Sequence, residues 1–156
     1  MDQIANWVRF ADTKATVLTA GLGVAVTILA SNATQIFNAV QQNWISGLCI
    51  GGLCLIAFVA FLWALFWLVR AIIPQRRVDY GQPNRFSWPS LANTTNTSLR
   101  DHLSSSSASD DAWQQVIDLS KLANRKFAAC TKAIYGFSTL LLSGFACVIG
   151  ALIVTM

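Results

Sequence analysis

The stretch from Ile45 to Val69 reads ISGLCIGGLCLIAFVAFLWALFWLV, twenty-five residues without a charged side chain. Trp44 precedes this run and Arg70 follows it. As an α-helix the run would be about 37 Å long, more than the roughly 30 Å of the hydrocarbon core of a bilayer. We therefore predict a membrane-spanning helix over residues 44–70, long enough to cross with some tilt.

The same stretch carries two features typical of membrane helices. Trp44 stands at one end, and Trp63 and Trp67 stand near the other, which is the pattern of an aromatic belt at the two membrane surfaces. Gly47 and Gly51 form a G-x-x-x-G pair, which permits another helix to approach closely.

Two further apolar runs lie outward from this one. The run from Thr16 to Ala30 has no charge, but fifteen residues of helix reach only about 22 Å, so the span must also take residues from 11–15 or from 32–37. The run from Ala133 to Met156 has twenty-four residues and no charge. We predict membrane helices over residues 15–36 and 133–156, which gives three spans in all.

A secretory signal peptide is the alternative interpretation of the first run. Arg9 and Lys14 would then form its basic region, and residues 31–33 its cleavage site. The segment before the run is net neutral and amphipathic rather than simply basic, which favours a retained helix.

The composition agrees with a membrane protein. Hydrophobic residues make up 54% of the 156 residues, charged residues make up 12%, and the mean hydropathy is +0.51. Soluble domains carry roughly 25% charged residues. Three of the four cysteines lie inside apolar runs and Cys130 lies beside one, as expected of small packing residues. Because His102 is the single histidine and no cysteine has ligand spacing to it, we predict no metal site.

Amphipathic helices are predicted on the polar side of the first and third spans. In residues 1–14, Trp7, Phe10 and Lys14 fall on one helical face. In residues 111–132, a polar side opposes a largely apolar one, and Asp111 suits a helix start. The polar side holds Gln114, Asp118, Lys121, Arg125 and Lys132, and the other holds Trp113, Val116, Ile117, Ala123 and Phe127. The predicted fold is an all-α membrane protein in which the first and third membrane helices extend into the cytoplasm as amphipathic helices.

Two segments have little tendency to form long helices. Residues 31–43 are polar and uncharged, and we predict a short loop there. Pro74 stops the second span. Residues 71–110 then form a predicted polar linker, rich in Ser and Thr, that buries too little apolar surface to order strongly.

The positions of the eleven Lys and Arg residues predict the orientation. All eleven lie before the first span or between the second and third, and none lies in residues 31–43 or after the third span. By the positive-inside rule, the N-terminus and the linker are cytoplasmic and the C-terminus lies outside. This placement explains the net charge of +4 better than nucleic-acid binding does.

The polar residues do not support catalysis but do suggest a binding patch. The sequence has no nucleophile paired with a histidine, no carboxylate pair at useful spacing and no phosphate-binding loop. Cations and aromatic residues of the two amphipathic helices would suit a small anionic nucleotide, since cations bind phosphate and aromatic rings stack on bases. The cations are Arg9, Lys14, Lys121, Arg125 and Lys126, and the aromatic residues are Trp7, Phe10, Trp113 and Phe127.

Anionic lipid headgroups and the membrane interface explain much of the same patch. Asp12 is the exception, because an acid gains little beside lipid headgroups. We predict that Asp12 forms a salt bridge or hydrogen bond with Lys121, Arg125 or Lys126.

Both ends of the chain resemble one family. The motif RFADTKA at residues 9–15, which leads directly into a span, resembles the N-terminal motif of the Pycsar transmembrane effectors. Asp111, Leu119-Ser120, Ala123 and Lys126-Phe127 are similar to the family's D…Q-I-x-x-L-S-x-I-x-x-x-K-Y helix, with Phe127 where Tyr is usual.

The resemblance implies a function in bacterial defence against phage. A partner cyclase would make the cyclic pyrimidine nucleotide cUMP or cCMP, which would bind the cytoplasmic helices. The inner membrane would then lose integrity, and the infected cell would die or stop growing. Arg9 and Lys126 are the expected phosphate contacts, Asp12 and Lys14 are structural partners or bind ribose, and no cofactor is implied.

Three spans do not readily enclose a pore, so we expect a homo-oligomer in the bilayer. Two alternatives remain open at this point. One is a small membrane scaffold whose cytoplasmic helices dock a protein, and the other is a constitutive holin-like pore without nucleotide sensing.

Overall fold

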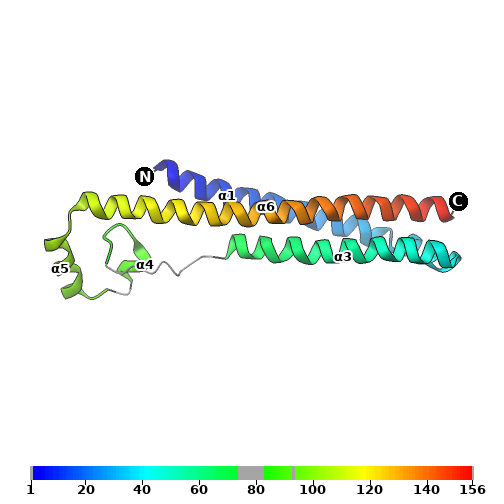
Figure 1. Ribbon diagram of the computed structural model, residues 1–156, viewed down its shortest axis with the longest axis horizontal. Coiled ribbons are helices and arrows are strands. Elements are labelled where there is room, and N and C mark those ends of the chain that lie inside the picture. Colours follow the sequence, from blue (N-terminus) through cyan, green and yellow to red (C-terminus); the bar gives the residue numbers. More distant parts are fainter. Residues whose placement is uncertain (1, 74–82, 93, 156) are drawn as a thin grey trace.

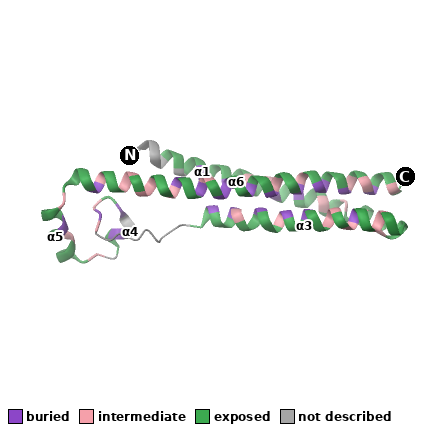
Figure 2. Cartoon of the chain, viewed as in Figure 1, coloured by how far each residue is buried: buried purple, intermediate pink, exposed green. Residues whose placement is uncertain are grey.

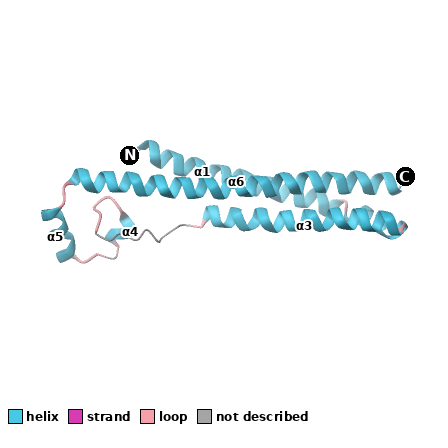
Figure 3. Cartoon of the chain, in the orientation of Figure 1, coloured by secondary structure: helices cyan, strands magenta, loops and turns pink. Residues whose placement is uncertain are grey.

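The computed structural model describes residues 2–73, 83–92 and 94–155. These residues form six helices and, within the described ranges, no strand (Figure 3). The helices are α1 (Asp2–Ser31), α2 (Ala33–Gln42), α3 (Trp44–Ile72), α4 (Trp88–Leu91), α5 (Asn96–Ser105) and α6 (Ala108–Thr155). Pro74, the predicted stop of the second span, lies outside the described residues, as do Arg76 and Arg77.

Three long helices form an elongated bundle (Figure 1). α1 and α6 run in the same direction, and α3 is antiparallel to both (Figure 1). Residues Arg9–Ser31, Trp44–Ile72 and Ala108–Thr155 are long and apolar enough to cross a membrane. This confirms the predicted all-α membrane fold with three spans. We call the end that carries Lys14, Arg70 and Lys132 the basic end, and the end that carries residues 31–43 the uncharged end.

The first and third spans each continue without a break into the predicted amphipathic helix. α1 is one helix from Asp2 to Ser31, and α6 is one helix of 48 residues. α6 begins at Ala108, before the predicted start at Asp111, because Ser107 caps it. The Asp110 N–H donates to Ser107 Oγ at 3.1 Å, and Ser107 Oγ donates to the Asp110 carboxylate at 2.7 Å.

The loop predicted over residues 31–43 is wrong, because the structure places α2 there. Ser31 ends α1, so the first span also does not run as one helix to residue 36. Ile36, Ala39 and Val40 supply an apolar face that packs with α3 and α6. The segment is mostly polar, so its composition did not reveal this apolar face. Tertiary packing stabilises a helix that local propensity alone does not predict.

Small side chains bring the long helices together. Ala15, Ala60, Ala64 and Ala133 are at least 94% buried, and the buried residues follow the facing sides of the helices (Figure 2). A Cβ on Gly136 would lie 2.9 Å from Trp63 Cδ1 and 3.0 Å from the Ala64 backbone nitrogen. Glycine is therefore required for the close crossing of α6 and α3.

The polar segment that contains α4 and α5 docks on the first turn of α6. The sequence predicted no strong order here, but four residues of the segment contact Asp111, namely Asn84, Arg85, His102 and Ser106. Asn84 Nδ2 donates to the Asp111 carbonyl at 2.9 Å, and Arg85 Nη2 donates to the Ser106 carbonyl at 2.8 Å. Polar contacts order the segment in place of the apolar core that its composition lacks.

Candidate functional site

The candidate site lies at the basic end, where α1 meets α6. The two helices touch along Ala11, Ala15, Cys130 and Ala133, which are all at least 98% buried. Cys130 Sγ lies 3.7 Å from the Ala11 carbonyl oxygen, a weak contact that shows how close the backbones are. Because these four residues are small, the longer side chains on either side of the contact line reach across to the other helix.

Asp12 and Lys126 form a salt bridge on one side of this line. Lys126 Nζ donates to Asp12 Oδ1 at 2.5 Å. The Lys126 side chain is only 10% exposed, whereas the Asp12 side chain is 49% exposed. A nearly buried ammonium group needs a partner, and Asp12 supplies it. The salt bridge expected for Asp12 is thus present, and Lys126 is its partner.

An aromatic cluster lies on the other side of the line. The centroids of Trp7, Phe10 and Phe127 are 6.2 to 6.5 Å apart, within the range of favourable aromatic pairs. Lys14 Nζ lies 4.5 Å from the Phe10 centroid and 5.6 Å from the Phe127 centroid. Trp7 and Phe10 are half exposed, so faces of the cluster remain open. We call Trp7, Phe10, Lys14 and Phe127 the aromatic site.

The helical repeat explains why the salt bridge and the aromatic site are separate. Lys126 and Phe127 are consecutive on α6, so they point about 100° apart. Each side chain meets α1 on a different side of the line through Ala11 and Ala15. The predicted patch is therefore two groups of residues, and both groups join α1 to α6.

Other predicted residues lie away from the aromatic site. Trp113 is fourteen residues before Phe127 on α6, about 21 Å along the helix, and is 66% exposed. Lys121 and Arg125 lie on the same side of α6 as Lys132. Lys132 Nζ is 4.1 Å from the centroid of Trp67 on α3. That side is turned away from Asp12. Arg9 is exposed one turn before Asp12. As ligand contacts, these four residues stay predictions.

A second polar cluster at the start of α6 was missed by the sequence analysis. Asp111, which is 5% exposed, accepts from Arg85 Nε at 2.6 Å and from Ser106 Oγ at 3.0 Å, and its other contact is His102 Nε2 at 2.9 Å. Burial by itself raises the pKa of Asp111, but the hydrogen bonds from Arg85, His102 and Ser106 outweigh it and lower the pKa from 3.8 to about 2. The lone histidine was a signal, but its partner Asp111 lies nine residues on, in the next helix, and Arg85 lies 26 residues before Asp111.

This second cluster is structural rather than metal-binding. Every polar atom of the Asp111 carboxylate is used by a protein donor. In the ranges that the structure describes, no group of three or more His, Cys, Asp or Glu residues is placed to hold a metal ion.

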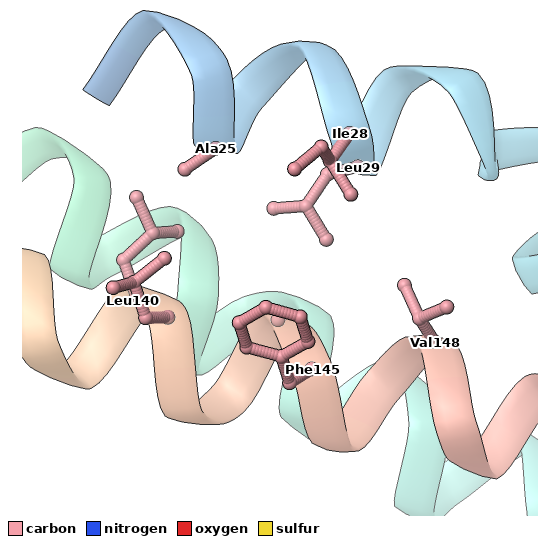
Figure 4. Close-up of a pocket in the computed structure, with 8 residues that line it drawn as sticks. Ala25, Ile28, Leu29, Leu140, Phe145 and Val148 are labelled. Atoms are coloured by element: carbon pink, nitrogen blue, oxygen red, sulfur yellow. The ribbon is translucent and has the colours of Figure 1, made fainter. Parts of the chain in front are cut away.

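The hollows between the spans are apolar. One of about 60 Å³ lies between α1 and α6 and is lined by Ala25, Leu29, Leu140, Phe145 and Val148, among others (Figure 4). It is too small and too apolar for a nucleotide. The α1–α6 contact beside it is close, since a Cβ on Gly144 would lie 3.2 Å from Leu29 Cδ2.

Fold and site together define a multi-pass membrane protein whose first and third spans are joined at the basic end by a salt bridge and an aromatic site. The chain belongs to the Pycsar effector family, because the family model described as Pycsar effector protein domain matches residues 1–156, the whole chain. No curated protein and no solved structure matches the chain. Membership supports a role as a membrane effector in defence against phage.

Proposed function

We propose that this effector binds cUMP or cCMP at the aromatic site and, when it does so, disrupts the bacterial inner membrane. The infected cell then dies or stops growing. The observation that carries the proposal is that Trp7, Phe10 and Lys14 of α1 meet Phe127 of α6 in one half-exposed cluster. A ligand at this cluster contacts both helices at once.

The aromatic site has the two chemical properties that a cyclic pyrimidine nucleotide requires. Its rings stack on the base, an interaction worth about 1–3 kcal/mol per base. Lys14 supplies a positive charge within reach of the cyclic phosphate. Arg9 and Lys126 remain candidate phosphate contacts, and a phosphate that reached Lys126 would compete with Asp12.

Binding at this site acts on the membrane through the helices themselves. A ligand shifts an equilibrium only toward a state that it binds more tightly. Phe127 and Phe10 lie on different helices, so a ligand that fits between them favours one relative position of α1 and α6. Each helix continues into a span without a break, so the shift reaches the bilayer.

The proposal includes an orientation and partners. The basic end faces the cytoplasm, where a partner cyclase makes the nucleotide, and the C-terminus faces outward. Several copies of the chain assemble in the bilayer, because three spans do not readily enclose a pore. The protein performs no catalysis in this scheme.

Calorimetry on the protein in nanodiscs tests the binding step. We expect heat of binding with cUMP or cCMP and at least tenfold weaker binding for Phe127→Ala. Tyr135→Ala is the matched control, because Tyr135 is an exposed aromatic residue of the same helix, about 12 Å beyond Phe127, and it should bind as the wild type does.

Liposomes loaded with a dye test the second step. Nucleotide should release the dye from liposomes that contain the wild type and not from those with Phe127→Ala. If neither nucleotide binds and no dye is released, the proposal is wrong and a scaffold role is favoured. Release without any nucleotide would favour a constitutive pore.

A further inference from the structure

From Thr16 to Gln42, one face of α1 and α2 carries only polar or small side chains. Its residues follow one another at intervals of three or four, so they share one side of a helix. None is charged and none has a large apolar side chain, and all are exposed. We call this set the polar stripe: Thr16, Ala20, Gly23, Thr27, Ser31, Gln35, Asn38 and Gln42.

On α1 the polar stripe lies opposite the packed side of the helix. Leu22, Ala25 and Leu29 face α6 and α3 within the core. On α2, Ile36 and Ala39 pack in the core, and the stripe residues lie beside them on the helix but are exposed. The stripe is therefore not covered by the described part of its own chain.

The depth of α2 in the bundle places most of the stripe inside the bilayer. Lys132 is the last charged residue of α6, and a core of about 30 Å extends roughly twenty residues from it, to about Leu152. Ala39 packs with Cys147 and Ala151, which lie within this length. Gln35, one turn before Ala39, is thus at hydrocarbon depth, Asn38 is at its edge, and the stripe from Thr16 to Ser31 is entirely inside.

The hydroxyl groups of the stripe are satisfied within the chain, but its amides are not. Thr27 Oγ1 donates to the Gly23 carbonyl at 2.9 Å, and Ser31 Oγ donates to the Thr27 carbonyl at 2.9 Å. The side-chain amides of Gln35 and Asn38 have no such partner among the residues that the structure describes. An amide without a hydrogen bond in hydrocarbon costs about 2–7 kcal/mol, so lipid tails are an unfavourable neighbour for this face.

Gly23 leaves room on the stripe for a close approach from outside the chain. A Cβ on Gly23 would have no atom within 4 Å, whereas a Cβ on Gly21 would lie 3.1 Å from the Phe137 ring. Glycine inside a helix costs about 1 kcal/mol relative to alanine. Gly21 serves packing within the chain, and Gly23 suits close approach by a helix from outside it.

We infer that the polar stripe is the contact surface between copies of this chain, with α1 and α2 of neighbouring copies facing a shared axis. A second copy fits the chemistry better than another partner does. An amide both donates and accepts hydrogen bonds, so Gln35 and Asn38 are complementary to their own copies. The stripe has no charge, so identical copies do not repel one another across it.

The inference also gives a route for membrane disruption, and in this respect it rests on the proposed function. Separation of the stripes around the axis replaces contacts between copies with water, which the hydroxyls and amides hydrogen-bond equally well. A nucleotide that shifts α1 against α6 moves the helix that carries the stripe. The polar path then runs from Thr27 to the uncharged end.

Cysteine cross-linking in membranes tests the contact itself, without nucleotide. Starting from a chain in which all four cysteines are replaced by Ser, single cysteines are placed on the stripe (Thr27→Cys, Gln35→Cys) and beside it (Ile28→Cys, Phe37→Cys). Ile28 and Phe37 are 44% and 61% exposed, so all four positions are accessible. Oxidation with copper phenanthroline converts two thiols into one disulfide, with oxygen as the electron acceptor.

We expect disulfide-linked dimers at the two stripe positions in at least fivefold excess over the two neighbours. Equal cross-linking on and beside the stripe, or none on the stripe, overturns the inference. Because no nucleotide is present, this result does not depend on whether the proposed function is right.

A second pair of variants tests the route. Gln35→Leu should abolish nucleotide-triggered dye release while nucleotide binding stays within twofold of the wild type. Ala33→Leu is the control, since Ala33 is exposed two residues before Gln35 and so points about 160° away from it on the helix. If the wild type binds no nucleotide, the proposed function fails. If it binds and Gln35→Leu still releases dye, the route fails.

Discussion

At the scale of single residues, Asp12 is the acid that a lipid-facing basic segment does not explain, and its contact with Lys126 joins α1 to α6. The Lys126 ammonium is the more buried of the two groups. Loss of its partner leaves a charge with poor access to water, which costs more than the pair contributes.

We predict that Asp12→Asn destabilises the contact between α1 and α6 by about 1–3 kcal/mol. Thermal unfolding in detergent measures the loss. Asp101→Asn is the control, because Asp101 is exposed on α5. If the salt bridge also stabilises the inactive state of the effector, Asp12→Asn releases some dye from liposomes without nucleotide. If Asp12→Asn is as stable as the wild type and releases no more dye, Asp12 neither stabilises the contact nor holds the inactive state.

Asp111 makes a separate prediction about pH. Its pKa is about 2 in the folded protein and 3.8 in the reference state, so the folded state holds the carboxylate form more strongly. A lowered pKa contributes stability that is fully present above about pH 4 and is lost as the pH falls toward about 2. Docking of residues 83–106 on α6 should weaken over this window.

Hydrogen exchange at residues 83–106 measures the docking. Protection should fall as the pH drops from about 4 toward about 2, and Asp111→Asn should lower it already at pH 7, while Asp101→Asn should not. Unchanged exchange in Asp111→Asn would mean that the Asp111 cluster does not hold the segment.

At the scale of elements, the packing of α3 on α6 depends on Gly136. A methyl group there would overlap Trp63 and the Ala64 backbone. We predict that Gly136→Ala lowers stability by about 1–3 kcal/mol through overpacking, measured by thermal unfolding in detergent.

Gly150 supplies the matched control on the same helix. A Cβ at Gly150 would meet nothing within 4 Å. Gly150→Ala should leave stability unchanged or raise it by up to about 1 kcal/mol, the usual gain in helix propensity. Equal effects of the two substitutions would show that the α3–α6 crossing tolerates a larger residue.

At the scale of the whole molecule, the charge distribution sets the predicted orientation. All eleven Lys and Arg residues lie on one side of the predicted spans. Alkaline phosphatase, which is active only outside the cytoplasm, should be active when it is fused to the C-terminus. Green fluorescent protein should fluoresce when it is fused to the N-terminus. The reverse pattern would place the aromatic site outside the cell, away from any cyclase product.

The sequence predicted the three spans because a bilayer demands about twenty apolar residues in a row, a signal that needs no tertiary contact. It also predicted that Asp12 has a basic partner, since an acid beside the membrane is unfavourable without one. The family was recognisable from residues 9–15 and from the helix after Asp111, and the family match over the whole chain confirms it.

Only the tertiary structure decided which partner Asp12 has and which aromatic residues meet. Lys121, Arg125 and Lys126 look equivalent along the sequence, but the small residues Ala11 and Cys130 fix the position of α6 and bring Lys126 alone to Asp12. The same packing separates Trp113 from Phe127. The sequence did not predict α2, because this helix is stabilised by packing on α3 and α6, and their faces exist only once the bundle has formed.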